Sequence, residues 1–269
     1  MILVSSFVAG LVFGSFLNVV IDRLKNGRNV VFGRSFCPKC KTQLKWYDLI
    51  PIGSFIYLFG RCRYCREKIS WQYPLVEILS GLIWISVFYK VFGLEFGIWD
   101  LFRISDFEFR IFEYIYYIFV LSALLIIAVY DFKWRIIPDK IIYPAVFIAL
   151  IYNTSSAFKL LNFEIFIIPI LTAAAAFLFF FLIYFFSRGS AMGLGDAKLA
   201  LLIGLFLKPF LAIVAFTLAF IVGAAFGIIL IGLGKKTLKS QIALGPFLIL
   251  GTIITFFLSD FFNNFISFL

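Results

Sequence analysis

The sequence predicts an all-α polytopic membrane protein, with about eight transmembrane helices and one small polar domain between the first two. Of its 269 residues, 63% are hydrophobic and only 14% are charged, and the mean hydropathy is +1.06. An ordinary soluble domain has about 25% charged residues. The composition therefore excludes a soluble globular protein, and the apolar residues are gathered in long runs separated by short polar segments.

These apolar runs define the predicted spans, because about 20 apolar residues cross a hydrocarbon core about 30 Å thick. Two shorter runs complete the eight if they pack against neighbours or thin the bilayer locally. The long runs lie near 1–20, 74–92, 111–130, 163–186, 209–233 and 242–259, and the short ones near 136–152 and 196–207. The first run lacks the basic segment that begins a cleavable signal peptide, so we expect it to be retained as a helix.

The distribution of basic residues predicts the orientation in the membrane. Nineteen of the 24 Lys and Arg residues fall in alternate loops, and eleven of these lie between 21 and 74. An acidic cluster that includes Glu95 and Asp100 falls on the other side, whereas Lys235, Lys236 and Lys239 fall on the basic side. Cytoplasmic loops carry the excess of basic residues. We therefore expect the N-terminus outside and the 21–74 loop in the cytoplasm.

The same distribution explains the net charge of +10. Basic cytoplasmic loops are attracted to anionic lipid, so the charge reflects membrane topology. We expect the lipid bilayer to be a partner of the protein and expect no nucleic acid.

The polar segment contains all four cysteines of the chain, as two CxxC pairs 21 residues apart: Cys37, Cys40, Cys62 and Cys65. Two such pairs separated by about 15–20 residues are typical of a Cys₄ zinc site. Disulfides are the alternative, and a reducing cytoplasm disfavours them. Four thiolates close the coordination sphere, so the predicted zinc is structural and holds a domain too small to fold unaided.

Two aspartates lie at the ends of predicted spans. Asp131 ends the third span in IIAVYDFKWRIIPDK, and Asp196 begins the sixth in GLGDAKL. Each alone is explained as a helix-end residue, with Asp196 as an N-cap. The chain has no histidine, so a hydrolase built from it would rely on carboxylates. Two close carboxylates share one proton, which lets one activate water while the other polarises a carbonyl, as in aspartic proteases.

Two glycines precede Asp196 in the motif. We expect Gly193 and Gly195 to permit unusual backbone angles and the close approach of an extended substrate. Asp139, in the IPD turn after the third span, is expected to cap the next helix or to support the turn. A phosphate-binding loop is excluded, because GLGDAK lacks the spacing and the Lys-Ser/Thr ending of a P-loop.

Sequence blocks along nearly the whole chain resemble the type IV prepilin peptidase family, which are membrane aspartyl proteases with a GxGD motif. In order, the blocks are GSFLNVVIDRL (14–24), CPKC, WYDLIP, GRCRYC, ISWQYPLVE (69–77), YDFKWRIIPD (130–139) and MGLGDAKL (192–199). The resemblance implies that Asp131 and Asp196 are the catalytic pair. It also implies that Gly193, Gly195, Lys198 and Asp139 support the active site.

The resemblance divides the chain into three parts. These are a first transmembrane helix (1–20), a cytoplasmic zinc domain associated with methyl transfer (21–74) and a transmembrane aspartyl protease domain (75–269). Members of this kind lie in the bacterial inner membrane, with both the zinc domain and the aspartates at the cytoplasmic face.

The resemblance further implies two activities. One is cleavage of the short basic leader of type IV prepilins or pseudopilins after a glycine, and the other is methylation of the new N-terminus with S-adenosylmethionine. Asn18, Gly60 and Glu77 come from the matched blocks and are candidates for methyl transfer, each with an ordinary packing or turn explanation. The chain has no GxGxxG loop for a soluble-type cofactor fold.

Two other classes of function remain open at this point. One is a transporter or channel with an aspartate relay and a regulatory zinc domain, although a transport site usually lies nearer the membrane midplane. The other is a non-catalytic platform for pilus or secretion assembly. Cleavage of a peptide with a basic leader, a glycine and an apolar helix separates all three classes.

Overall fold

The structure is a computed structural model, and it describes residues 2–30, 33–93, 104–161, 163–190, 192–234 and 243–267. Glu95, Asp100, Lys235, Lys236 and Lys239, which entered the prediction of orientation, lie outside these ranges. The chain divides into two compact units, residues 1–126 and 127–269, with the boundary inside a long helix. Within the described ranges the secondary structure is helical apart from two isolated β-bridges, which confirms the all-α fold.

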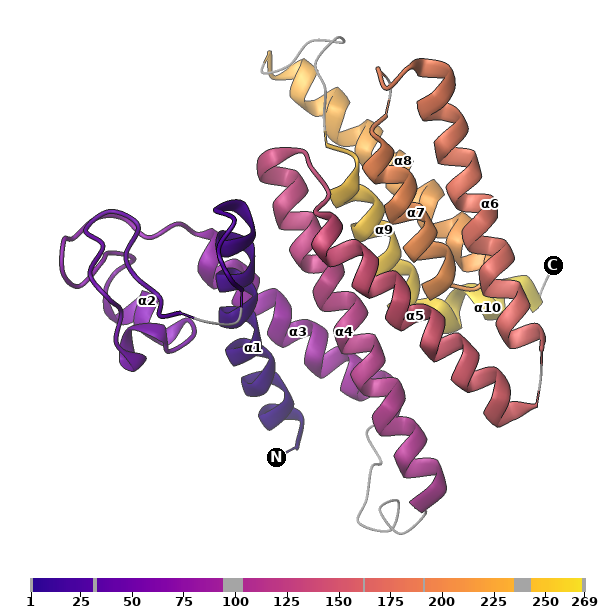
Figure 1. The fold of residues 1–269 in the computed structure, drawn as a ribbon, viewed down its shortest axis with the longest axis horizontal. Helices are drawn as coiled ribbons and strands as arrows, with labels where there is room; N and C mark the ends of the chain where they lie inside the picture. The colour runs from indigo at the N-terminus through magenta and orange to yellow at the C-terminus, as the bar shows by residue number, and fades with distance from the viewer. Residues whose placement is uncertain are drawn as a thin grey trace. The chain divides into compact units, whose positions relative to one another are not determined.

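The first unit pairs two long helices, and the polar insert that joins them lies to one side of the pair (Figure 1). Helix α1 (Ile2–Lys25) packs against α3 (Gln72–Phe92), and the insert between them contains the short helices η1 (Trp46–Leu49) and α2 (Gly53–Tyr57). The helix that crosses the unit boundary, α4 (Ile104–Trp134), follows α3.

Glycines bring α1 and α3 into close contact. A Cβ built on Gly10 would lie 2.8 Å from the Cα of Gly81, and one on Gly14 would lie 2.7 Å from the Cα of Glu77. Gly10 and Gly14 form a GxxxG motif, which lets membrane helices approach backbone to backbone. The insert is therefore held between the ends of a tightly packed helix pair.

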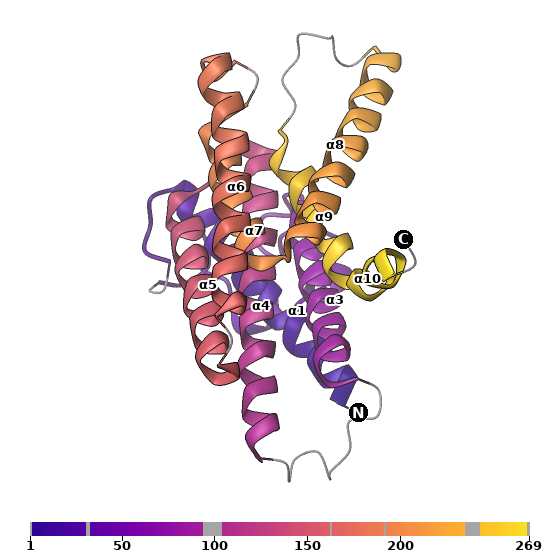
Figure 2. The same ribbon diagram turned by 90° about the vertical axis from the view of Figure 1, so that its right-hand side faces the viewer.

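The second unit contains α5 (Asp139–Leu160), α6 (Glu164–Ser187), α7 (Leu194–Phe206), α8 (Pro209–Gly232), α9 (Gly245–Phe257) and α10 (Ser259–Ser267). Helix α7 contacts α5, α6, α8 and α9, and its neighbours surround it in both views (Figures 1 and 2). Most of its side chains after Asp196 are fully buried, among them Leu199, Leu202 and Ile203. Asp196 thus stands at the start of the central helix of this unit.

Small residues also allow the helices of this unit to approach one another closely. A Cβ on Gly204 of α7 would lie 2.5 Å from the Cα of Ala173 in α6, and Gly251 of α9 lies against the backbone of Ala215 in α8. The buried Asn153 of α5 donates to the Leu205 carbonyl of α7 at 3.1 Å. Close backbone packing and one interhelical hydrogen bond therefore fix α7 in place.

Among the described residues, six helices are long and apolar enough to cross a membrane. The predicted short run near 136–152 belongs to a full-length helix, α5. The run near 242–259 was predicted to be a long span, but its helix α9 has only 13 residues, as does α7. Helix α9 begins at Gly245-Pro246, where proline's missing N–H suits the first turn of a helix. Thirteen residues rise about 20 Å, less than a hydrocarbon core.

Candidate active site and metal centre

Asp131 lies in the last turns of α4, where the helix is about to end. The chain leaves the helix at Arg135, which has a φ of +55° and donates its backbone N–H to the Asp131 carbonyl at 2.8 Å. The Asp131 side chain is only 6% exposed. Its Oδ2 is buried and has no hydrogen-bond partner among the described residues. A buried polar atom left unpaired is costly, so each one needs an explanation in function, strain or a bound water, and the backbone of Gly245 also approaches this carboxylate.

Gly245, the first residue of α9, lies against this carboxylate. A Cβ built on Gly245 would lie 2.6 Å from Asp131 Oδ2, closer than real Cβ atoms approach a neighbour. Glycine is therefore required here if Asp131 keeps its position. The sequence analysis did not identify Gly245, and the Gly-Pro pair that starts α9 indicates only a helix start.

Asp196 occupies the third position of α7, and the helix N-cap is Gly193. Asp196 is therefore not the N-cap residue, which lies three positions earlier in the chain. Its side chain nevertheless accepts a hydrogen bond from the backbone of the N-cap. Its Oδ2 accepts the Gly193 N–H at 3.2 Å, and the Asp196 N–H donates back to the Gly193 carbonyl at 3.1 Å. The side-chain bond is the N3-to-N-cap half of a capping box, because Gly193 has no side chain to supply the other half, and it fixes the carboxylate relative to the backbone.

The two motif glycines have different surroundings. Gly193 is extended, with φ −82° and ψ 152°, and neither glycine has a positive φ, so the expected unusual backbone angles are absent. A Cβ on Gly195 would lie 3.1 Å from the Cβ of Ile137, which belongs to the segment after Asp131. Gly195 therefore permits close packing of α7 on that segment, while Gly193 leaves an exposed, open edge beside Asp196.

Lys198 and Asp139 join α7 to the start of α5. Lys198 Nζ lies 2.6 Å from Asp139 Oδ1 and 5.0 Å from the centre of the Tyr143 ring. Asp139 is the first residue of α5. Its side chain is 56% exposed, so this ion pair lies at the surface. The pair ties the IPD turn to the GxGD helix.

These contacts bring Asp131 and Asp196 together within the 127–269 unit. Gly195 packs against Ile137, and the two carboxylates are close enough for the charge of one to act on the other. The arrangement supplies two neighbouring acids, one of them with an unpaired buried oxygen. Two neighbouring acids are the groups that carboxylate-based hydrolysis requires in a chain without histidine.

The four cysteines lie in two knuckles with the same hydrogen-bond pattern, repeated about 25 residues apart. In the first knuckle Cys37 N–H donates to the Thr42 carbonyl and Lys41 N–H to the Cys37 carbonyl. In the second, Cys62 and Arg66 make the equivalent bonds, and bridges Phe36↔Gln43 and Arg61↔Lys68 close both hairpins. Lys41 and Arg66 have positive φ values of 58° and 61°.

The cysteine sulfurs suit a tetrahedral metal. All four are free thiols, and their Sγ atoms lie within 4.8 Å of one another, with Cys37 and Cys65 at 3.9 Å. Sulfurs about 2.3 Å from a central zinc are about 3.8 Å apart. Hydrogen bonds from the side chain and then the backbone of Thr42 lower the pKa of the Cys40 thiol to about 6. The donor set therefore fits a closed, structural zinc site.

Asn18, Gly60 and Glu77 all make structural contacts in the first unit. Asn18 Nδ2 donates to the Tyr73 carbonyl at 3.0 Å, and its Oδ1 accepts from Gln72 Nε2 at 3.2 Å. Gly60 has a φ of +67° and accepts the Ile69 N–H at 2.8 Å. Glu77 is buried and its Oε2 accepts the Ile52 N–H at 2.8 Å. The Asn18 bonds thus join α1 to α3, the Gly60 bond lies within the insert, and the Glu77 bond ties the insert to α3.

Comparison with known proteins identifies families for both units. Residues 8–91 match the bacterial peptidase A24 N-terminal domain, and residues 118–228 match the type IV leader peptidase family. No solved structure matches the chain.

Several curated proteins are similar over most of the chain, and each is named prepilin leader peptidase/N-methyltransferase. The protein of Klebsiella pneumoniae is 32% identical over 75% of this chain and 83% of its own length. That of Vibrio cholerae is 32% identical over 80% and 82%, and that of Bacillus subtilis is 28% identical over 94% and 93%. These likenesses favour an enzyme over the transporter and the assembly platform. Because they extend through both units, the chain belongs to the type IV leader peptidase family and is a membrane peptidase.

Proposed function

We propose that this enzyme cleaves the basic leader of type IV prepilins or pseudopilins after a glycine, with Asp131 and Asp196 as its catalytic dyad. The observation that carries this proposal is that α4 and α7 bring two carboxylates together in one unit, with Asp131 Oδ2 buried and unpaired among the described residues. The family membership supplies the substrate class.

In this mechanism one aspartate is ionised and the other keeps a proton, because two adjacent carboxylates do not both ionise comfortably. The ionised one removes a proton from the attacking water, and the protonated one donates to the oxygen of the scissile carbonyl. The exposed backbone at Gly193 gives an extended peptide access to Asp196. Gly245 leaves the space that Asp131 occupies.

The second proposed activity is N-methylation of the cleaved substrate, and the names of the relatives support it. S-adenosylmethionine would supply the methyl group on a positively charged sulfur. The neutral N-terminal amine forms the new N–C bond with its lone pair while the S–C bond breaks and its electron pair stays on sulfur. The amine then loses one proton, which leaves a neutral thioether and an N-methyl amine.

The proposed zinc is structural, held by the four cysteines of the two knuckles. The enzyme is proposed to lie in the bacterial inner membrane with its N-terminus outside, and with the insert and both aspartates at the cytoplasmic face. A substrate whose apolar helix lies in the bilayer then presents its leader to the dyad at that interface.

Mass spectrometry of a co-expressed prepilin tests both activities in one measurement. We expect a cut after glycine and one added methyl group on the new N-terminal residue. An uncut substrate that inserts correctly beside folded enzyme contradicts the proposed peptidase, and a cut substrate without added mass contradicts the methyltransferase.

A further inference from the structure

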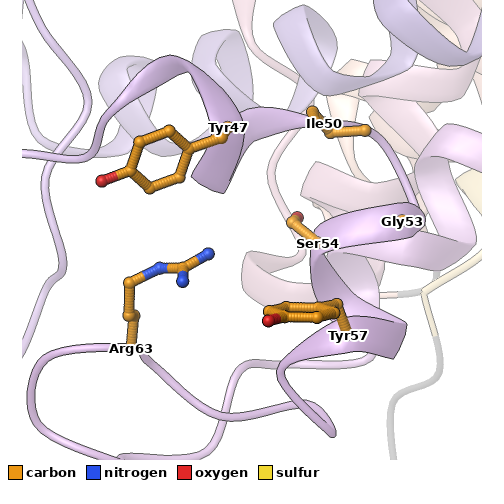
Figure 3. A pocket seen from close by; sticks show the side chains of 6 residues that line it. All are labelled: Tyr47, Ile50, Gly53, Ser54, Tyr57 and Arg63. Atoms are coloured by element: carbon orange, nitrogen blue, oxygen red, sulfur yellow. The ribbon is translucent and has the colours of Figure 1, made fainter.

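The insert has a hollow of about 400 Å³ on its surface. It is lined by two tyrosines, an arginine and three smaller residues: Tyr47, Ile50, Gly53, Ser54, Tyr57 and Arg63 (Figure 3). Small-molecule sites commonly have volumes of about 300–1,000 Å³. The hollow is thus large enough for one small ligand, and none of its lining residues belongs to the proposed dyad or metal site.

Arg63 is oriented by a carboxylate on one side. Its Nε donates to Asp48 Oδ1 at 2.7 Å, while Asp48 Oδ2 accepts from the Tyr64 hydroxyl at 3.0 Å and the Lys45 N–H at 3.1 Å. Burial opposes the charge of Asp48, yet these hydrogen bonds, that of Arg63 first, lower its pKa. Asp48 therefore stays ionised at neutral pH and keeps Nε engaged. The outer end of the guanidinium points into the hollow (Figure 3).

Two aromatic rings flank this guanidinium. Its central carbon lies 4.9 Å from the centre of the Tyr47 ring and 5.8 Å from that of Tyr57. Tyr57 is 73% exposed, so much of its ring surface is open for a ligand to cover. The faces of such rings attract cations and stack on planar rings.

The walls of the hollow are fixed by the rest of the first unit. Arg63 is the first residue between Cys62 and Cys65, so folding of the second knuckle around its metal also places the guanidinium. The other wall, α2, begins after Ile52, whose N–H is held by the buried Glu77 of α3. A span and a metal knuckle thus jointly shape the hollow.

The charges discriminate among small ligands. Asp48 engages Nε of Arg63 and partly balances its charge, so the outer N–H groups can still donate to a singly charged carboxylate, whereas a multiply charged anion such as phosphate gains little further attraction. A ligand that combines a carboxylate, a cationic centre and a planar ring can use the guanidinium and both tyrosine faces together. S-adenosylmethionine has these three groups, in its amino-acid carboxylate, its sulfonium and its adenine.

We propose that this hollow is the S-adenosylmethionine site, an inference that rests on the proposed methyl transfer. Arg63 holds the carboxylate, Tyr47 and Tyr57 present their rings to the sulfonium and the adenine, and Ser54 offers a hydroxyl to the ribose. The metal knuckle then serves methyl transfer by placing Arg63, without itself taking part in the chemistry.

Equilibrium dialysis of the full-length enzyme in lipid nanodiscs against radiolabelled S-adenosylmethionine tests the site without relying on turnover. We expect Tyr57→Leu and Arg63→Lys each to raise the Kd by about tenfold, because leucine has no π face and lysine lacks the planar fork of arginine. Tyr57→Phe should bind within about twofold of the wild type, since it keeps the ring.

Arg61→Lys is the matched control, because Arg61 is an exposed arginine in the same knuckle and does not line the hollow. Zinc content of every variant shows whether the insert is folded. Wild-type affinity in folded Tyr57→Leu and Arg63→Lys proteins overturns the assignment of the hollow but leaves the methyltransferase standing. Equal weakening by Tyr57→Phe and Tyr57→Leu also overturns it, since the ring face would then contribute nothing.

Two further results would be decisive. A wild-type enzyme that neither binds the donor nor methylates a cut substrate overturns the proposed methyl transfer and this site with it. Variants that bind the donor normally but lose affinity for a synthetic mature N-terminal peptide show that the hollow holds the methyl acceptor, which overturns the proposal.

Discussion

The metal insert and the aspartate unit position their key side chains in different ways. In the insert, each cysteine pair is held by hydrogen bonds between residues close in sequence, and the same pattern occurs twice. In the 127–269 unit, Asp131 and Asp196 come from separate helices, with Gly195 of α7 packed against Ile137 in the segment after α4 and Gly245 of α9 packed against Asp131. Local hydrogen bonding together with the proposed zinc therefore builds the first site, whereas helix packing builds the second. Perturbing one should leave much of the other intact.

The largest expected effect is loss of cleavage in Asp131→Asn or Asp196→Asn. An amide supplies neither the base nor the shared proton, so cleavage should fall by at least about 10³-fold. Release of the leader from a purified prepilin measures this. Both variants should still bind one zinc and methylate a synthetic mature peptide. Substantial cleavage by either one would exclude it from the dyad.

The reciprocal experiment removes the metal ligands Cys62 and Cys65 together. The Cys62→Ser/Cys65→Ser enzyme should lose its zinc, because two thiolates no longer close the site, and the insert should unfold. Methyl transfer should be lost, and the substrate should be cut but unmethylated in the presence of S-adenosylmethionine. Cleavage should weaken only as far as the insert helps to place the leader.

Metal analysis and mass spectrometry of the substrate measure these effects together. Normal methylation by this variant would show that the insert is not the methyltransferase element. Complete loss of cleavage with the membrane helices still folded would show that the two sites are not separable.

A smaller but sharper effect is expected from Gly245→Ala. The added Cβ would lie 2.6 Å from Asp131 Oδ2, so the carboxylate must move away from its present position. Misplacement of a catalytic group by about 1 Å can cost about 10²-fold in rate. Gly232→Ala is the matched control, because nothing lies within 4 Å of the Cβ it would add in α8. Equal cleavage rates of the two alanine variants would mean that Asp131 tolerates displacement.

The comparison also explains what the sequence could and could not predict. The cysteines were recognisable because their spacing alone describes a zinc site, and the knuckle hydrogen bonds follow from that spacing. Asp131 and Asp196 were recognisable because a carboxylate in an apolar run is costly. The membrane class and five of the six long runs likewise follow from composition and length, as the structure confirms, whereas the run near 242–259 forms a short helix and the run near 136–152 a long one.

Gly245 and Arg63 were not recognisable in this way. Gly245 looks like any Gly-Pro helix start, and its contact with Asp131 exists only after α9 has packed in the unit. Arg63 looks like one more basic residue of the polar insert, and its pairing with Asp48 requires the folded insert. The short length of α9 was hidden because the apolar run near 242–259 starts three residues before the helix and continues one residue past its end. Such features depend on tertiary packing, which residue patterns do not specify.

The smallest expected effect concerns the ion pair between Lys198 and Asp139, which joins α7 to α5. Because Asp139 is 56% exposed, water screens the pair, and such pairs contribute about 0–1 kcal/mol. We expect Lys198→Met and Asp139→Asn each to reduce cleavage only about twofold to fivefold. The double variant should be no worse than the more impaired single variant, because the same interaction is lost in all three variants.

The control for loss of one positive charge is Lys140→Met, because Lys140 is exposed and is the neighbour of Asp139 in the chain. Cleavage rates at low and high salt complete the test, since added salt should narrow the gap between wild type and the single variants. A loss of about 10³-fold in Asp139→Asn would instead place Asp139 beside Asp131 and Asp196 in the chemistry, and would show that the surface between α5 and α7 is part of the active site.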